Sequence, residues 1–384
     1  MEEDKVLKLK NCSILQFSKI AEERKVYGFG VSIQLNIHIK LRTPDFDLTD
    51  MVDVLVDNDK KKVGSFYRSG GKEIPVISVS EMLASVKEED VLIILSNQYG
   101  EIVEDLDQYN KLEKVDTYIL RYIDDFPDSE LDENQFNLSK AKEFQIPPVI
   151  HYCWFGENKM PDKYLTFIES WKKYCPDYQI KKWDETNYDI NKHPYMRSAY
   201  LMKKWAFVSD YARLDIIYNH GGIYLDSDVE LLQSLDELRK FQAYLGYEST
   251  QMINTGLGFG AGKGNKIIKE LRDAYDKVDF PGEGELTPCT VHQTQRLRML
   301  GLKCNNSFQI IGCNEMAILP TDFLCGIRLE TRKKQITRNT VSLHHWCGDW
   351  GSSKEQIKYG EMLREKYDNQ LLRRLPEPLE FEDV

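Results

Sequence analysis

The stretch that decides the fold is Trp205–Glu230, WAFVSDYARLDIIYNHGGIYLDSDVE. Its first half, Ala206–Tyr218, carries apolar residues at helical spacing and contains no glycine or proline, which predicts an α-helix. A pair of glycines follows, and glycines commonly lie just past the end of a helix. The short apolar run Ile223–Leu225 then predicts a buried strand, which ends at Asp226 and Asp228. We therefore expect a helix, a turn and a strand whose end is acidic.

Asp226 and Asp228 are two positions apart, and side chains at that spacing on an extended segment point the same way. Two close carboxylates repel each other unless a cation compensates their charge. Their oxygens suit Mn²⁺ or Mg²⁺, and such ions often join a protein to the phosphates of a substrate. An isolated Asp-x-Asp is also common in polar turns, so the neighbouring residues must decide between a metal site and a turn.

The preceding helix carries Asp210 and Arg213, which are three residues apart and can therefore form an ion pair on one helix face. The combined pattern, from Ser209 through the two glycines to Asp228, resembles the DXD-containing sugar transferases of glycosyltransferase family 32, which include many capsular polysaccharide enzymes. The resemblance implies a GT-A-type domain. It also implies that the catalytic residues are Asp210, Arg213, Asp226 and Asp228, with Ser209 and Tyr224 in the substrate pocket.

Two further segments extend this resemblance. Residues 146–156 (IPPVIHYCWFG) predict the first buried strand of the domain, and the family pattern places Trp154 against the base of a donor nucleotide. An aromatic residue at a strand end can equally belong to the core. The family also has an Asn-Thr/Asn-Gly segment beside the donor sugar, which implies substrate contacts for Asn254 and Thr255.

Residues 341–350 (VSLHHWCGDW) resemble the closing motif of the family, with Asp349 in place of its serine. In similar enzymes a histidine of this motif joins the DXD aspartates on the metal ion, and imidazole is a good ligand for manganese. Adjacent histidines on a strand face opposite ways, so one of the pair is expected at the ion. The spacing favours His344, with His345 as the alternative, and a structural histidine pair without a metal is the competing interpretation.

The first part of the chain, residues 1–125, alternates short apolar runs with helical segments, which predicts a Rossmann-like parallel sheet. Gly28 and Gly30 follow the first strand, where such folds bind phosphates, but Ile33 replaces the third glycine of the dinucleotide motif. Asp57 can hold a ribose or cap a turn. The segment resembles Rossmann-like modules of bacterial nucleotide-sugar and polysaccharide enzymes, so a bound nucleotide and a structural role both remain open.

Composition limits the classes of partner. The 384 residues contain 51 basic and 62 acidic side chains, a net charge of −11, which disfavours nucleic acid as a partner. Eight scattered cysteines without a CxxC pair indicate reduced thiols. The N-terminus has no signal-peptide core and no apolar run is long enough to span a bilayer. We expect a cytoplasmic protein, with peripheral association with the inner face of the membrane as an alternative.

These observations predict three parts: a Rossmann-like domain over residues 1–125, a linker over 126–145 and a GT-A-type transferase domain over 146–384. The expected reaction moves a sugar from a nucleoside diphosphate sugar, such as a UDP-sugar, to a glycan or lipid-linked glycan with retention of configuration. Mn²⁺ or Mg²⁺ is the expected cofactor, and Glu248 is a candidate nucleophile. A metal-dependent nucleotidyl or sugar-phosphate transferase and a non-catalytic nucleotide-sugar-binding scaffold are the alternatives.

Overall fold

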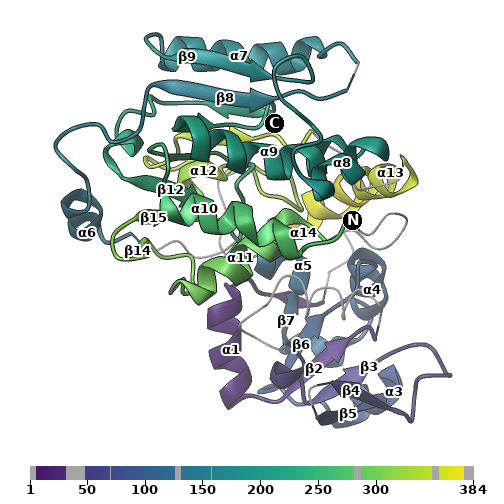
Figure 1. Ribbon diagram of the computed structural model, residues 1–384. Helices are drawn as coiled ribbons and strands as arrows, with labels where there is room; N and C mark the ends of the chain where they lie inside the picture. The colour runs from purple at the N-terminus through teal and green to yellow at the C-terminus, as the bar shows by residue number, and fades with distance from the viewer. Residues whose placement is uncertain are drawn as a thin grey trace. The chain divides into compact units, whose positions relative to one another are not determined.

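The computed structural model describes residues 6–31, 48–69, 71–125, 131–156, 158–280, 287–347 and 354–375 (Figure 1). The described residues of Met1–Asp128 and Glu355–Phe381 form one compact unit, and those of Ser129–Lys354 form the other. None of the described helices is both long and apolar enough to cross a membrane.

The first unit is built on a seven-stranded sheet. Its strands are β1 (Lys8–Leu9), β2 (Val26–Phe29), β3 (Val54–Val56), β4 (Phe66–Ser69), β5 (Lys72–Ile77), β6 (Val91–Ile94) and β7 (Asp116–Ile119). They lie in the order β1-β7-β6-β2-β3-β5-β4, and all neighbours are parallel except β4 and β5. The central order β5-β3-β2-β6-β7 is that of a Rossmann fold, as the sequence predicts.

Helices and 3₁₀ turns precede or follow these strands in the described part of the unit. They are α1 (Ile14–Glu23), α3 (Val79–Ser85), α4 (Tyr99–Leu106), α5 (Leu120–Asp125) and the turns Leu48–Met51 and Asn110–Leu112. The helix α1 begins with a capping box, in which the Ser13 hydroxyl accepts from the Gln16 amide and the Gln16 side chain accepts from the Ser13 amide. This reciprocal pair satisfies two amides at the first turn and fixes where the helix starts.

The C-terminal helical segment packs into the first unit. It comprises α13 (Lys354–Leu363), a π-helical turn (Arg364–Asp368), α14 (Asn369–Leu371) and a 3₁₀ turn (Leu372–Arg374). Leu363, Tyr367 and Leu371 join its hydrophobic core. This segment therefore belongs to the first unit and not to the predicted domain 146–384, because its apolar residues are buried in the core of the Rossmann-like unit.

Asp57 caps a turn at the end of β3. Its carboxylate accepts hydrogen bonds from the Val31 amide (2.9 Å), the Asp59 amide (2.8 Å) and the Lys62 ammonium (3.1 Å). The sequence allows Asp57 either to hold a ribose or to cap a turn, and these contacts are those of a turn cap. Ile33, on which the comparison with dinucleotide motifs depends, lies outside the described residues.

The second unit contains a seven-stranded mixed sheet and a two-stranded sheet. The strands of the large sheet are β8 (Val149–Cys153), β9 (Gln179–Trp183), β10 (Gly222–Tyr224), β12 (Ala243–Gly246), β13 (Phe259–Ala261), β14 (Gln309–Ile311) and β15 (Met316–Leu319). They lie in the order β14-β15-β12-β13-β10-β8-β9. The small sheet pairs β11 (Val229–Leu231) with β16 (Ser342–His344) in antiparallel fashion.

The helices of this unit are α6 (Glu133–Leu138), α7 (Asp162–Tyr174), α8 (Pro194–Leu201), α9 (Trp205–His220), α10 (Lys266–Asp273), α11 (Cys289–Met299) and α12 (Thr321–Leu324), with 3₁₀ turns at Leu238–Lys240 and Ala274–Lys277. The segment expected to be a linker, residues 126–145, contains α6. Phe136 of this helix packs against Phe241, Phe308 and Phe323 of the second unit, so this part of the segment is folded onto it. The predicted fold class is confirmed: a Rossmann-like parallel sheet is followed by a mixed α/β unit consistent with the GT-A type.

Strand direction brings the important loops to one edge of the large sheet. β8, β9 and β10 are parallel, and β12 runs the same way because both β10 and β12 are antiparallel to β13. The residues that follow β8, β10 and β12 therefore share an edge with the residues that precede β13. Ligands of open α/β sheets bind at the carboxyl ends of the strands, and this edge is the corresponding position.

The helix α9 and strand β10 form the predicted helix, turn and strand. Residues Ala206–Ile217 of α9 are all buried, which explains why the helix is apolar on more than one face. Gly221 (φ +68°) and Gly222 (φ +110°) then reverse the chain. A Cβ at Gly222 would lie 2.7 Å from the Val149 carbonyl oxygen, so a side chain there would separate β10 from β8.

Candidate active site

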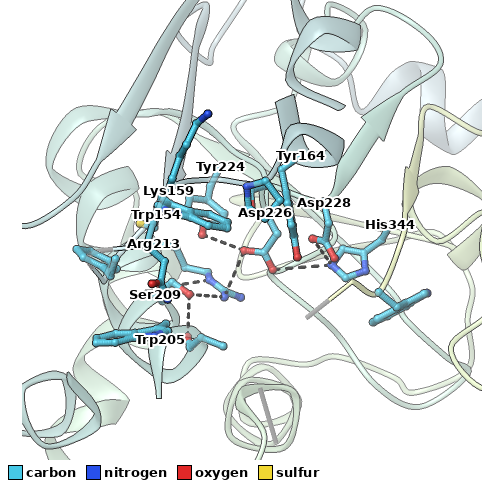
Figure 2. Close-up of a pocket in the computed structure, with 17 residues that line it drawn as sticks. Trp154, Lys159, Tyr164, Trp205, Ser209, Arg213, Tyr224, Asp226, Asp228 and His344 are labelled. Atoms are coloured by element: carbon cyan, nitrogen blue, oxygen red, sulfur yellow. Dashed lines mark hydrogen bonds and ion pairs between the residues drawn. The ribbon is translucent and has the colours of Figure 1, made fainter. Parts of the chain in front are cut away.

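Two carboxylates and an imidazole converge just beyond the end of β10. Asp226 and Asp228 lie in the turn between β10 and β11, and His344 is the last residue of β16. The β11–β16 register places Val229 opposite His344, which brings the histidine to the acidic turn. The His344 Nε2 atom lies 3.4 Å from Asp228 Oδ1 and 3.8 Å from Asp226 Oδ2 (Figure 2).

This cluster has the composition and spacing of a divalent cation site. Each of the three residues offers one ligand atom, and these atoms all lie within 4.8 Å of one another. Both ring nitrogens of His344 are buried and have no hydrogen-bond partner among the described residues. A buried imidazole that makes no hydrogen bond beside two carboxylates is costly, and a cation would compensate both kinds of group. The residues therefore fit a metal ion of the Mn²⁺ or Mg²⁺ type.

Electrostatics at the cluster point the same way. Burial lowers the pKa of His344, but the charges of Asp228 and Asp226 outweigh burial, and the pKa is raised overall. Burial raises the pKa of Asp226, but the Arg213 and His344 charges outweigh it, and its pKa is lowered. The site thus attracts positive charge, and a bound cation would displace the proton from the histidine.

A main-chain amide holds Asp228 in place, and the adjacent histidine, His345, makes its contacts elsewhere. Asp228 Oδ2 accepts the Cys347 amide at 2.8 Å, which leaves Oδ1 directed at His344. His345 instead stacks on Phe167, with ring centroids 4.2 Å apart, and its Nε2 lies 2.8 Å from Glu230. Of the two histidines considered from the sequence, His344 is the one that the structure places beside the aspartates.

A buried guanidinium connects the predicted helix pair to the acidic turn. Arg213 Nη2 lies 3.0 Å from Asp210 and 3.4 Å from Asp226, and Arg213 is only 2% exposed. It also donates to the Ser209 hydroxyl and to the Thr255 hydroxyl. Burial raises the pKa of Asp210 to about 6, against the opposing effect of Arg213. The pair is therefore part of the site and not an isolated helix-surface ion pair.

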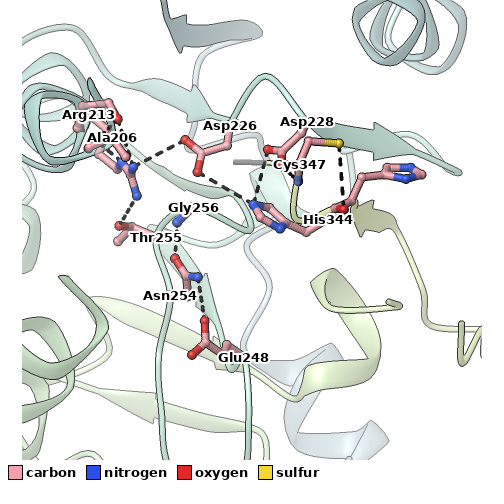
Figure 3. Close-up of polar contacts among 12 residues, drawn as sticks. Ala206, Arg213, Asp226, Asp228, Glu248, Asn254, Thr255, Gly256, His344 and Cys347 are labelled. Atoms are coloured by element: carbon pink, nitrogen blue, oxygen red, sulfur yellow. Dashed lines mark hydrogen bonds and ion pairs between the residues drawn. The ribbon is translucent and has the colours of Figure 1, made fainter. Parts of the chain in front are cut away.

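The segment before β13 passes close to the acidic turn. Asn254 Oδ1 accepts the Gly256 amide at 2.6 Å, and Asn254 Nδ2 donates to Glu248 at 2.8 Å (Figure 3). A Cβ on Gly256 would lie 2.5 Å from Asp226 Oδ2, so only a glycine allows this close approach. Tyr224 donates its hydroxyl to Asp226 Oδ1 at 2.9 Å from the other side.

A cavity of about 350 Å³ opens beside these groups. Trp154 lies in it and contacts Tyr164 edge-to-face, with ring centroids 5.2 Å apart. Trp205 and Trp346, which are not among the predicted site residues, also line it. The lining includes the predicted residues Trp154, Ser209, Arg213, Tyr224, Asp226, Asp228 and His344, whereas Asp210, Asn254 and Thr255 are not part of it.

His151 has a structural position. Its Nδ1 accepts the Trp183 indole at 3.0 Å, and its Nε2 lies 3.0 Å from the Gly221 carbonyl oxygen. Burial lowers the pKa of His151 to about 4, so the ring is neutral. The helix α11 begins at Cys289, and residues 281–286 lie outside the described part.

Comparison with known proteins identifies the class of this region. Residues 161–245 match the family described as "Glycosyltransferase sugar-binding region containing DXD motif". This match includes the four predicted catalytic residues, Asp210, Arg213, Asp226 and Asp228. The chain therefore contains a DXD-type glycosyltransferase region.

Two curated relatives match over part of their length. The chain is 30% identical over 122 residues to inositol phosphoceramide mannosyltransferase 3 of Schizosaccharomyces pombe, covering 30% of this chain and 34% of that protein. It is 28% identical over 179 residues to subversion of eukaryotic traffic protein A of Legionella pneumophila, covering 38% of this chain and 28% of that protein. The chain thus spans about a third or less of the length of these relatives.

Two solved structures are also similar. The PaToxG glycosyltransferase matches with 20% identity and a TM-score of 0.35, over 43% of this chain and 74% of its own. A glycosyltransferase involved in glycosylation of the major capsid of PBCV-1 matches with 14% identity and a TM-score of 0.29, over 56% of this chain and 100% of its own.

Proposed function

We propose that the protein is a metal-dependent glycosyltransferase of the family 32 type. It moves a sugar from a nucleoside diphosphate donor, of which a UDP-sugar is the first candidate, to a glycan or lipid-linked glycan such as a growing capsular polysaccharide. The observation that carries the proposal is the convergence of Asp226, Asp228 and His344 at an aromatic-lined cavity. Because one curated relative is a mannosyltransferase, mannose is a further candidate for the sugar of the donor.

The difficult step is departure of the nucleoside diphosphate with its negative charge. Asp226, Asp228 and His344 would hold a divalent cation, which would supply positive charge to the departing oxygens. At about 4 Å and an effective dielectric constant of about 20, one pair of unit charges contributes about 4 kcal/mol. That amount corresponds to roughly a thousand-fold in rate if it acts only in the transition state.

The protein side chains position the donor around this charge. Trp154 lines the cavity and offers an aromatic face for the nucleotide base. Arg213 also lines it and provides a donor for sugar hydroxyls, and Asp210 holds its guanidinium through their 3.0 Å ion pair. The Arg213 guanidinium, at 3.4 Å, and the Tyr224 hydroxyl both hold Oδ1 of Asp226 in place. These contacts preorganise the site before the donor binds.

The experiment is a screen of nucleoside diphosphate sugars with the purified protein, with and without Mn²⁺, in which released nucleoside diphosphate is measured. We expect metal-dependent release with at least one donor. Asp228→Asn should lose that release while keeping the melting temperature of the wild type. Asp177→Asn removes an exposed carboxylate of the same unit and serves as the matched control, for which we expect wild-type activity.

The identity of the products separates the proposal from its alternatives. Release of nucleoside diphosphate indicates sugar transfer or donor hydrolysis, whereas release of a sugar phosphate would indicate cleavage within the diphosphate. Binding of nucleotide sugars without any cleavage would indicate a scaffold. Undiminished turnover in a folded Asp228→Asn variant would refute the metal-dependent mechanism.

A further inference from the structure

A second acidic group lies at the same edge of the sheet as the proposed metal ligands. Glu248 follows β12 by two residues, and β12 runs in the same direction as β10. One strand, β13, separates them, so at about 4.8 Å between neighbouring strands the two strand ends are roughly 10 Å apart. The segment that carries Asn254 and Gly256 lies between the two groups and contacts Glu248 on one side and approaches Asp226 on the other.

Asn254 fixes the orientation of Glu248 across this interval. Asn254 is 8% exposed, and its carbonyl oxygen accepts the Gly256 amide at 2.6 Å. This bond fixes the amide orientation, so that Nδ2 donates to Glu248 Oε2 at 2.8 Å. In Figure 3, Asn254 lies between Glu248 and the Asp226 carboxylate.

The segment that carries Asn254 also meets the proposed sugar-binding and metal-binding residues. A Cβ at Gly256 would approach three atoms: Asp226 Oδ2 (2.5 Å), Asn254 Oδ1 (2.9 Å) and Arg213 Nη1 (3.4 Å). Glu248 is half-buried and is joined to this segment by its hydrogen bond from Asn254.

We propose that Glu248 is a catalytic carboxylate that faces the donor sugar on the side away from Asp226 and Asp228, and that Asn254 is its positioning residue. The inference rests on the proposed glycosyltransferase function. A negative charge at that place stabilises the positive charge that develops on the sugar as the leaving group departs. The same geometry makes Glu248 distant from the departing diphosphate, which a carboxylate would otherwise repel.

The step balances without a covalent enzyme intermediate. The bond between the anomeric carbon and the diphosphate oxygen breaks, and its electron pair goes to the diphosphate. Positive charge then develops on the anomeric carbon and the ring oxygen, opposite the Glu248 carboxylate. The acceptor hydroxyl oxygen forms the new bond to the anomeric carbon, and its proton passes to the released diphosphate. Glu248 keeps its charge throughout.

The test compares donor hydrolysis without acceptor and sugar transfer with acceptor in the wild type and Glu248→Gln. The substitution keeps the shape and the hydrogen bond from Asn254 but removes the charge. We expect kcat to fall about 100-fold in both reactions, with the Kd for nucleoside diphosphate and Mn²⁺ unchanged. Glu315→Gln changes a half-buried glutamate of the same unit that precedes β15, at the opposite sheet edge, and should behave as wild type.

A double-mutant comparison tests the role of Asn254. Asn254→Ala should lower kcat with little change in KM, and the Glu248→Gln/Asn254→Ala double variant should be no slower than Glu248→Gln alone. An independent structural effect of Asn254 would instead add to the loss. Glu248→Asp keeps the charge on a shorter side chain, so its kcat should lie between the values of the wild type and Glu248→Gln. If the Glu248→Gln variant folds poorly, Glu248→Asp provides the test in its place.

Three results would overturn the inference. A loss in transfer alone, with hydrolysis unchanged, would make Glu248 a base for the acceptor. A weaker Kd for nucleoside diphosphate with unchanged kcat would make it a binding residue, and unchanged kcat in both reactions would exclude any catalytic role. If the wild type cleaves no nucleoside diphosphate sugar at all, the proposed function itself fails, which is a different outcome from each of these.

Discussion

Gly256→Ala tests how closely the segment before β13 approaches the acidic turn. The added Cβ would lie 2.5 Å from Asp226 Oδ2, whereas ordinary contacts begin near 3.4 Å. The carboxylate must therefore move by about 0.9 Å, the difference between these two distances. Asp226 is at the end of a flexible side chain, so the fold should tolerate the shift. Metal ligands are placed to within about 0.2 Å, and a misplacement of about 1 Å in a catalytic site can reduce the rate by about 100-fold.

The assay for this prediction is Mn²⁺ dependence of nucleoside diphosphate release, together with thermal unfolding. We expect weaker Mn²⁺ activation and a kcat lower by about 100-fold, with a melting temperature within a few degrees of the wild type. Gly262→Ala is the matched control, because a Cβ there would meet only the Gln145 carbonyl oxygen at 3.4 Å. A folded Gly256→Ala protein with wild-type Mn²⁺ affinity and kcat would refute the placement of Asp226 in the metal site.

Three further predictions concern other parts of the chain. Trp154→Ala should raise the Kd for nucleoside diphosphate about ten-fold by isothermal titration calorimetry, because stacking of a base contributes about 1–3 kcal/mol. Asp368→Ala should lower the free energy of unfolding of the first unit by about 3–5 kcal/mol in urea titrations, because the buried carboxylate pairs with Arg121 and accepts the hydroxyls of Tyr99 and Tyr122; a change below 1 kcal/mol would contradict the packing of the π-helical turn Arg364–Asp368. The imidazole of His151 should titrate near pH 4 by NMR, since burial depresses its pKa. Its contribution to stability is present above the unfolded pKa of about 6.5 and is lost as the pH falls toward 4, and titration near 6.5 would show that the ring is solvated.

The central stretch is predictable because local pattern and tertiary structure agree there. The helical spacing of apolar residues and the two glycines are sufficient to predict α9, the reversal and β10. By contrast, β1 is two residues long and β11 is three, which is too short for periodicity to detect. The strand order and the β11–β16 pairing depend on contacts between distant segments, which a single sequence does not contain.

The C-terminal helix shows what an apolar stripe can and cannot predict. Leu363, Tyr367 and Leu371 indicate that one face is buried, as the structure has it. The stripe carries no information about which sheet covers it, and the buried Asp368 that accepts from Tyr99 has no signal in the sequence. The assignment of this helix to the transferase domain therefore differs from the structure.

The sequence predicts the charged residues of the candidate site more completely than its aromatic residues. Asp226, Asp228 and His344 come together as the motif implies. Trp205 could have been found, because it lies four residues before Ser209 on the same helix face. Tyr164 reaches the cavity from α7, a helix with ordinary surface composition, so its role depends on the tertiary structure.

The β11–β16 pairing has a consequence for the order of events during protein synthesis. The acidic turn leaves the ribosome first, and its two carboxylates remain without their imidazole until residue 344 has been made and β16 has docked. A nascent chain thus carries the larger sheet before the third residue of the proposed metal site is in place. A nonsense codon anywhere between the acidic turn and β16 would leave a polypeptide that has the whole DXD sequence and lacks the histidine of that site.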